Sequence, residues 1–201
     1  MRPYILAETN WDQMKDRDAE LAVLPWGATE AHNYHLPYAC DTIEAEMIAA
    51  EAAGIAWEKG ADVVVLPPVP YGVNTGQRDI YLDLNIYPST QFVILQDILQ
   101  VLDRQGIFKL MILNSHGGNE FRPIIRELNA SFPRMFISAA NWYEALDLSD
   151  YFENPGDHAD EMETSLLLYL CPDLVLSRDK WGEGCEKKNR ITAFEEKWLW
   201  T

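Results

Sequence analysis

The sequence is poor in cysteine, in positive charge and in long apolar runs. Its 201 residues include three cysteines, and 16 basic residues stand against 32 acidic ones, which gives a formal net charge of −16. Three cysteines without regular spacing predict reduced, part-buried thiols and argue against a disulfide framework. A negative field of this size repels phosphate backbones, so we expect no nucleic-acid partner.

The lack of long apolar runs indicates where in the cell the protein is expected. No run approaches the roughly 20 residues that a membrane-spanning helix needs, and the first residues, "MRPYILAETNWDQM", lack the apolar core of a secretory signal. We therefore expect a cytoplasmic protein with no membrane partner. The hydrophobic fraction of 48% and the length predict a single globular domain over residues 1–201.

Short β-type runs alternate with helical patterns along the chain. The strands are expected at 21–25, 61–68, 108–114 and 134–140, and the helices at about 42–58, 91–104, 120–130 and 161–170. This order predicts an α/β fold with a mainly parallel sheet. In such sheets ligands bind beyond the carboxyl ends of the strands, which is where the polar residues of this sequence collect.

The stretch "GATEAHNYHLPYACDT" follows the first expected strand and holds two of the four histidines. In an extended segment, Glu30 and His32 leave the same face with Cα atoms roughly 6.5–7 Å apart, a spacing that suits two neighbouring metal ions. Asp41 could bridge both ions with its two oxygens. Alternatively, "DTIE" indicates a helix N-cap at Asp41, unless Thr42 caps the helix and leaves Asp41 free.

A second polar segment, "NSHGGNE", follows the third expected strand. His116 stands at the strand end, and Gly117 and Gly118 allow a sharp turn and a close approach to a ligand. Asn119 can cap the next helix. The alternative for His116 is a structural hydrogen bond, and no G-x-G-x-x-G pattern indicates a dinucleotide site.

The third segment, "GDHADEMETS", precedes the last expected helix. His158 could transfer protons near neutral pH, or it is an ordinary surface histidine. Asp160 and Glu163 have the spacing of a capping box, so we expect Glu163 to be engaged there and Glu161 to be free to point into the site. Together the candidates offer oxygen and imidazole ligands without thiolate, a set that suits Zn²⁺, Mn²⁺ or Fe²⁺.

At these residues the sequence resembles the creatininase family, in particular its formamide-hydrolase branch with a His-Gly-Gly-Asn motif. Three motifs carry the resemblance: "LPWGATEAHNYHLPYACDT", "NSHGGNE" and "HADEMETSLLLYLCPDLV". Their order and spacing match the family over roughly residues 15 to 180.

The resemblance implies a three-layer α/β/α hydrolase with two divalent metal ions, commonly hexameric, that cleaves amide bonds in rings or formamides. By position, the implied metal ligands are Glu30, His32, Asp41, His116 and Glu161, with Asp41 bridging the two ions. His158 matches the family's catalytic histidine, assisted by Glu161, and Trp142 matches one wall of the substrate pocket. Ser115, Gly117 and Gly118 complete the expected substrate-binding set.

Two departures from the family pattern concern the substrate. A second pocket tryptophan is replaced within "ENPGDH", and the loop "NTGQRDIYLDLNIYPST" differs from the usual Phe-Pro-Gly-Thr stretch. We therefore expect a small-molecule amide other than creatinine. Family members also usually continue for some tens of residues, so we expect the C-terminal segment of the family to be lacking. The alternatives are hydrolysis of a cyclic polyol ketone and a non-catalytic relative that binds a small ligand.

Overall fold

The computed structural model describes residues 2–154, 156, 158–184, 191–195 and 199. Its centre is a four-stranded sheet in the order β2-β1-β3-β4, in which every neighbouring pair is parallel. The strands are β1 (Leu21–Trp26), β2 (Val63–Val65), β3 (Lys109–Asn114) and β4 (Phe136–Asn141). Their continuous apolar runs fit a sheet that is covered on both faces.

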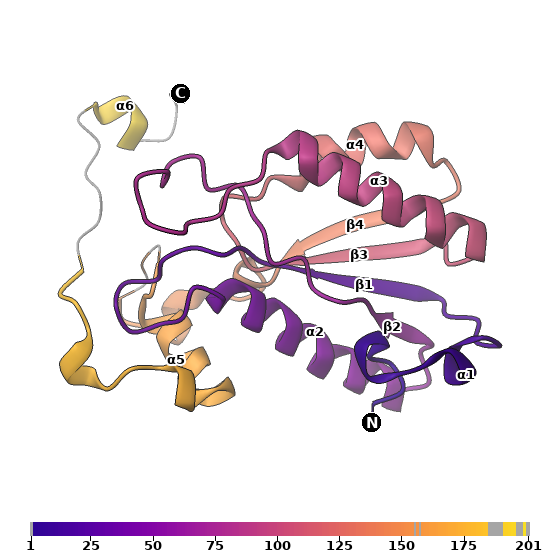
Figure 1. The fold of residues 1–201 in the computed structure, drawn as a ribbon, viewed down its shortest axis with the longest axis horizontal. Helices are drawn as coiled ribbons and strands as arrows, with labels where there is room; N and C mark the ends of the chain where they lie inside the picture. Colours follow the sequence, from indigo (N-terminus) through magenta and orange to yellow (C-terminus); the bar gives the residue numbers. More distant parts are fainter. Residues whose placement is uncertain (1, 155, 157, 185–190, 196–198, 200–201) are drawn as a thin grey trace.

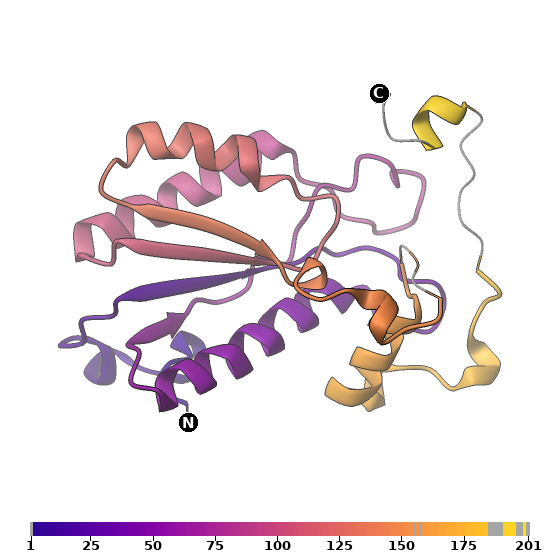
Figure 2. The ribbon, with the colours of Figure 1, turned by 180° about the vertical axis from the view of Figure 1, so that it is seen from behind.

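Helices cover both faces of the sheet, as Figures 1 and 2 show. The chain runs from β1 outward to β2 and then back across to β3 and β4. Right-handed crossovers therefore place α2 on one face and α3 and α4 on the other. The helices are α1 (Trp11–Met14), α2 (Cys40–Glu58), α3 (Pro88–Gln105), α4 (Phe121–Ser131), α5 (Glu161–Leu170) and α6 (Thr192–Glu195). The short 3₁₀ helices are η1 (Leu6–Glu8), η2 (Trp142–Glu144), η3 (Leu148–Asp150), η4 (Pro172–Leu174) and η5 (Arg178–Lys180).

Each face of the sheet has its own core. Between the sheet and the α3–α4 layer, Leu24, Leu99, Ile112 and Leu128 are almost fully buried in one large cluster. Between the sheet and α2 the cluster is built from small residues such as Ala49, which let the helix approach closely. The predicted α/β/α layers with a parallel sheet are confirmed.

Two predicted helix caps are wrong. The helix α2 begins at Cys40 after Ala39, and no side chain caps it. The Thr42 hydroxyl instead donates to the carbonyl of Ala28, and Asp41 lies inside the first turn, so it is not an N-cap. At α4 the cap is the Glu120 carboxylate, which accepts from the N–H of Arg122.

Asn119, the predicted cap of α4, ties loops together. Its amide oxygen accepts from Val73 N–H and from Gln91, and its amide nitrogen donates to Asn114. These contacts fix the loops that leave the carboxyl edge of the sheet.

Two further predictions concern the thiols and the membrane. Cys40 and Cys171 are free thiols, while Cys185 lies outside the described residues. None of the helices in the described part of the chain is both long and apolar enough to cross a bilayer.

Candidate metal centre

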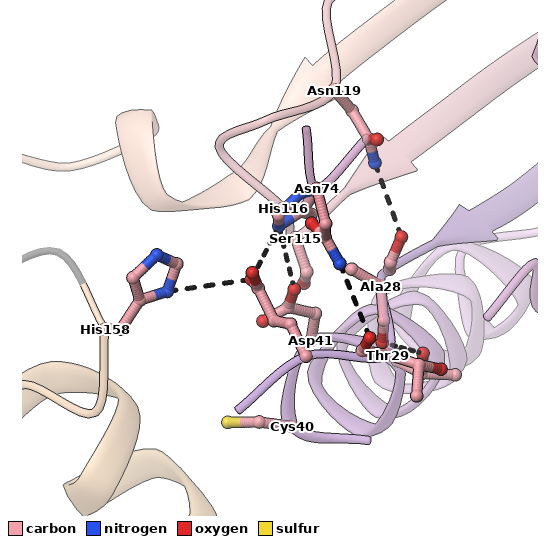
Figure 3. A network of polar contacts seen from close by, with 12 residues as sticks. Ala28, Thr29, Cys40, Asp41, Asn74, Ser115, His116, Asn119 and His158 are labelled. Carbon is pink, nitrogen blue, oxygen red and sulfur yellow. Dashed lines mark hydrogen bonds and ion pairs between the residues drawn. The ribbon is translucent and has the colours of Figure 1, made fainter. Parts of the chain in front are cut away.

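Four buried side chains converge beyond the carboxyl edge of β1 and β3. Trp26 and Asn114, the last residues of these strands, are paired in register, so the loops that follow them start side by side. The first loop carries Glu30 and His32, and the second carries His116. Asp41 enters from the first turn of α2 (Figure 3). All four side chains are at most 4% exposed.

Asp41 lies between the two imidazoles. Its Oδ1 is 3.0 Å from His32 Nε2, and its Oδ2 is 3.1 Å from His116 Nδ1. The Oε1 atom of Glu30 is 2.8 Å from the same His116 nitrogen. One carboxylate thus faces two nitrogen donors with its two oxygens, which is the arrangement predicted for a bridging ligand.

The atoms that face one another here make no hydrogen bond despite these short distances. Glu30 Oε1, His32 Nε2, Asp41 Oδ2 and His116 Nδ1 are all buried and lack a partner in hydrogen-bonding geometry among the described residues. Buried polar atoms without partners are costly and rare in proteins. The atoms of Glu30, Asp41 and His116 lie within 4.8 Å of one another, and His32 faces the other oxygen of Asp41. Both arrangements fit a cation, because carboxylate oxygen and imidazole nitrogen are its ligands.

The outer nitrogen of each ring is held by a backbone carbonyl. His32 Nδ1 lies 3.2 Å from the carbonyl oxygen of Glu30, and His116 Nε2 lies 3.1 Å from that of Val73. A ring N–H that donates to a carbonyl fixes the tautomer, so the other nitrogen is left as a lone pair for a ligand role.

The electrostatics of the cluster favour positive charge. Burial lowers the pKa of His116, but Asp41 and Glu30 outweigh burial and raise it to about 10. Burial also lowers the pKa of His32, but Asp41 and Glu163 outweigh burial and raise this pKa well above its usual value. Burial raises the pKa of Asp41, yet the two histidines hold it well below its usual range. A divalent cation supplies such charge when it replaces the ring protons.

The expected last ligand, Glu161, is not at the cluster. It is the exposed first residue of α5, and its Oε2 accepts from the N–H groups of Glu153 and Asn154. Glu163 is there instead: it is 7% exposed, and its Oε1 lies 3.7 Å from His32 Nε2. The Asp160 side chain caps the helix as predicted, but Glu163 uses only its other oxygen locally, to accept from Ala159 N–H. One carboxylate can serve both partners, so capping did not remove Glu163 from the site.

Two residues beside the cluster, Cys40 and Glu44, were not among the ligands expected from the sequence. Asp41, Glu44 and Glu163 bring ligand atoms within 4.8 Å of one another, and Cys40 does the same with His32 and Asp41. Glu44 follows Asp41 by three residues and shares its helix face, a spacing that could have indicated it. Burial, together with the nearby carboxylates, raises the pKa values of Glu44 and of the Cys40 thiol, so neither is favoured as an anion.

His158 stands at the mouth of the site. Its side chain is 40% exposed, its Nδ1 lies 3.6 Å from Glu30 Oε1, and its ring is 5.3 Å from that of His32. His158 lines a cavity of about 380 Å³ together with residues 73–77 and 116–118. Figure 3 shows His158 and His116 turned toward the carboxylates near Asp41.

Two of the four expected substrate-binding residues, Gly117 and Gly118, are in the lining of this cavity, whereas Ser115 and Trp142 are not. A Cβ on Gly118 would collide with the Val73 carbonyl and the His116 ring. Trp142 is half-buried, and its indole N–H donates to the Ser115 hydroxyl. The remaining histidine, His35, is structural in its contacts: it hydrogen-bonds Thr164 at 2.9 Å and stacks on Trp181.

Comparison with known proteins now decides the family. The family model "Creatininase: Creatinine amidohydrolase" matches residues 7–201. The chain belongs to the creatininase family. Its branch within the family, expected from the His-Gly-Gly-Asn motif, is part of the proposal below.

Characterised relatives of this creatininase-family chain are hydrolases with different substrates. Creatinine amidohydrolase of Pseudomonas putida is 25% identical over 197 residues, which cover 85% of this chain and 73% of that protein. A mycofactocin precursor peptide peptidase of Mycolicibacterium smegmatis is 29% identical, over 78% of this chain and 60% of the relative. A 3-dehydro-scyllo-inosose hydrolase of Thermotoga maritima is 27% identical, over 88% and 58%. The chain thus spans about three fifths of the length of these last two relatives.

Solved structures share the fold. A Bacteroides fragilis protein, provisionally named a creatinine amidohydrolase, superposes with a TM-score of 0.94 at 40% identity, over all of this chain and 80% of that one. A creatininase structure named for manganese gives a TM-score of 0.73 at 23% identity, over 88% of this chain and 76% of that one. A mutant creatininase of the Zn-Zn type gives 0.71 at 24%, over 86% and 74%. The names of the last two neighbours mention Mn or Zn. The present cluster has oxygen and nitrogen donors that suit either ion.

Proposed function

We propose that this chain is a metal-dependent hydrolase that cleaves a C–N bond in a cyclic amide or a formamide. The observation that carries the proposal is the set of four buried, partnerless ligand atoms around Asp41. Glu30, Asp41 and His116 would hold one Zn²⁺ or Mn²⁺ ion, and their ligand atoms lie within 4.8 Å of one another. His32, Asp41 and Glu163 would hold the second, with Glu163 in the place that the sequence assigned to Glu161.

The metal ions would supply an activated water and polarise the substrate carbonyl. Side chains of the protein would hold the ions, transfer the proton and bound the substrate. The buried carboxylates and rings would hold the ions and keep bulk water away from them. His158, at the cavity mouth, is placed to protonate the leaving nitrogen, a role that is typically worth 10²–10⁴-fold in rate. Trp142 and the turn at Gly117 would bound the substrate.

The size of the cavity supports a small-molecule substrate. At about 380 Å³ it has room for a small molecule, and its lining contains His158 and no tryptophan among the described residues. A homo-oligomer, hexameric by family resemblance, a cytoplasmic location and membership of the formamide-hydrolase branch belong to the same proposal.

A second candidate function is the opening of a cyclic polyol ketone at the same metal site. It is favoured by one observation: the Thermotoga maritima relative that matches 88% of this chain is named a 3-dehydro-scyllo-inosose hydrolase. The same donors and the same His158 would serve, with carbon in place of nitrogen as the leaving atom.

The test is a substrate panel run with protein loaded with zinc or manganese. Creatinine, N-formyl amines, a short peptide and 3-dehydro-scyllo-inosose are compared, and Asp41→Ala is assayed beside the unaltered chain. We expect turnover of a cyclic amide or formamide, two metal ions per chain by elemental analysis, and loss of both in Asp41→Ala. Unchanged metal content in Asp41→Ala would contradict the site, and two bound ions without turnover of any compound would favour the non-catalytic alternative.

A further inference from the structure

Gln77 touches two groups of the site from outside the ligand set. It lies in the long loop between β2 and α3, within the stretch that departs from the family pattern. Its Nε2 lies 2.8 Å from Glu30 Oε2 and 3.3 Å from His158 Nε2. One side-chain amide therefore joins a proposed metal ligand to the proposed proton donor.

The chemistry of the partners fixes which end of the amide faces them. A carboxylate oxygen only accepts hydrogen bonds, and a neutral ring nitrogen without a proton does the same. The NH₂ group of Gln77 has two N–H bonds and can donate one to each partner. The amide oxygen in that position would repel the Glu30 carboxylate, so the NH₂ end faces the site.

We propose that Gln77 is a positioning residue that couples Glu30 to His158. By holding Oε2 of Glu30, it leaves Oε1, the atom 2.8 Å from His116 Nδ1, for the metal centre. By donating to His158 Nε2, it leaves the proton of the neutral ring on Nδ1 and keeps the ring over the cavity. The inference rests on the metal site of the proposed function, but it does not depend on the substrate or on proton transfer by His158.

His158 needs such support because little else holds it. Its side chain is 40% exposed, and among the described residues its polar contacts are with Gln77 and Glu30 alone. The next residue, Ala159, has a backbone φ of 52°, in the left-handed region, so the turn before α5 is not a regular helix start. A histidine on such a turn gains a defined position from a hydrogen bond across the cavity.

The loop that carries Gln77 is itself tied to the loop that carries Glu30. Asp83 accepts from the N–H of Ala31 at 2.7 Å, and the N–H of Leu84 donates to the carbonyl of Thr29 at 3.0 Å. These bonds place the two loops in a fixed relation. Gln77 is therefore delivered to Glu30 by an ordered segment, as a positioning group requires.

The test compares Gln77→Leu and Gln77→Asn with the control Asp79→Asn. Leucine fills a similar volume without donors, and asparagine is one methylene too short to reach both partners. Asp79 lies exposed in the same loop, with no polar partner among the described residues. Two properties are measured without any substrate: Zn²⁺ affinity by competition with a chromophoric chelator, and the ¹⁵N imidazole shifts of His158 in the zinc-loaded protein, assigned with His158→Asn.

We expect Gln77→Leu to weaken zinc binding by roughly 10–100-fold and to shift His158 away from the Nδ1–H tautomer. Gln77→Asn should show a smaller change in the same direction, and Asp79→Asn should match the unaltered chain. Zinc affinity within twofold in both Gln77 variants, or an affinity loss with an unchanged His158 tautomer, would overturn the coupling. Failure of the substrate panel would sink the proposed hydrolase function and leave these two measurements unaffected.

Discussion

The two ends of the central sheet treat charged groups in opposite ways. At the amino end, Arg17 donates to the Asp62 carboxylate at 2.8 Å from its Nε and to the carbonyls of Pro3 and Val63, both at 2.6 Å. At the carboxyl end, Glu30, His32, Asp41 and His116 turn ligand atoms toward one another without a hydrogen bond.

The difference separates structural charge from functional charge. The N–H groups of Arg17 donate to Asp62, Pro3 and Val63, and these hydrogen bonds hold the start of β2 in place without a further ligand. The carboxyl end buries carboxylates against imidazole rings, an arrangement that costs folding free energy unless protons or a cation balance the charge. The carboxyl end of the sheet is therefore expected to be less stable without a metal ion than with one.

The largest effect is expected from Glu163→Gln, because it changes the carboxyl end directly. Glu163 lies beside His32, whereas Glu161, two residues earlier, faces the backbone of residues 153 and 154. Glu163→Gln should lose one of two zinc ions per chain by elemental analysis.

The matched variant Glu161→Gln should keep both zinc ions. If Glu161→Gln lost an ion and Glu163→Gln did not, the assignment by sequence would stand and the geometry would be wrong.

A moderate effect is expected at the amino end. Asp62→Asn leaves the Arg17 guanidinium without its anionic partner, whose side chain is 37% exposed. We expect the free energy of unfolding in urea to fall by about 1–2 kcal/mol, with unchanged zinc content. Loss of zinc in this variant would show that the two ends are not separate in function.

The smallest effect is expected for the surface pair of Arg2 and Glu8. Hydrogen bonds from the Arg2 side chain and backbone lower the pKa of Glu8 to about 2, from a usual value of 4.5. Since the folded-state pKa is the lower one, the pair stabilises the fold above pH 4.5 and loses that contribution as pH falls toward 2.

The variant Glu8→Gln should therefore unfold more easily than the unaltered chain at pH 6, and the difference should narrow below pH 4.5. A difference in denaturation midpoint that stays constant from pH 6 to pH 3 would contradict this account.

The fold follows from local patterns in the sequence. Continuous β-branched runs such as Val63–Val65 and the amphipathic period of α3 are decided within a few residues. Their alternation leaves few topologies, because parallel crossovers are right-handed. The positions of Glu30, His32, Asp41 and His116 at one edge follow from the same rule, although their role as ligands stays a prediction.

Contacts between segments that are distant in the chain could not be predicted from the sequence. The choice between Glu161 and Glu163 depends on which face α5 turns toward His32, and a capping pattern does not determine that. Asn119 looks like a helix cap, yet its partners are Val73 and Gln91, which are 46 and 28 residues away. Gln77 carries no local signal, since its contacts with Glu30 and His158 arise only when three loops meet.

The most direct test of the metal centre is anomalous X-ray scattering at the zinc and manganese edges, on crystals grown with both ions at millimolar concentration. The account predicts two peaks per chain, each about 2.0–2.2 Å from a carboxylate oxygen of Asp41, with His116 beside one and His32 beside the other. Crystals without an anomalous peak within bonding distance of Asp41 would contradict it.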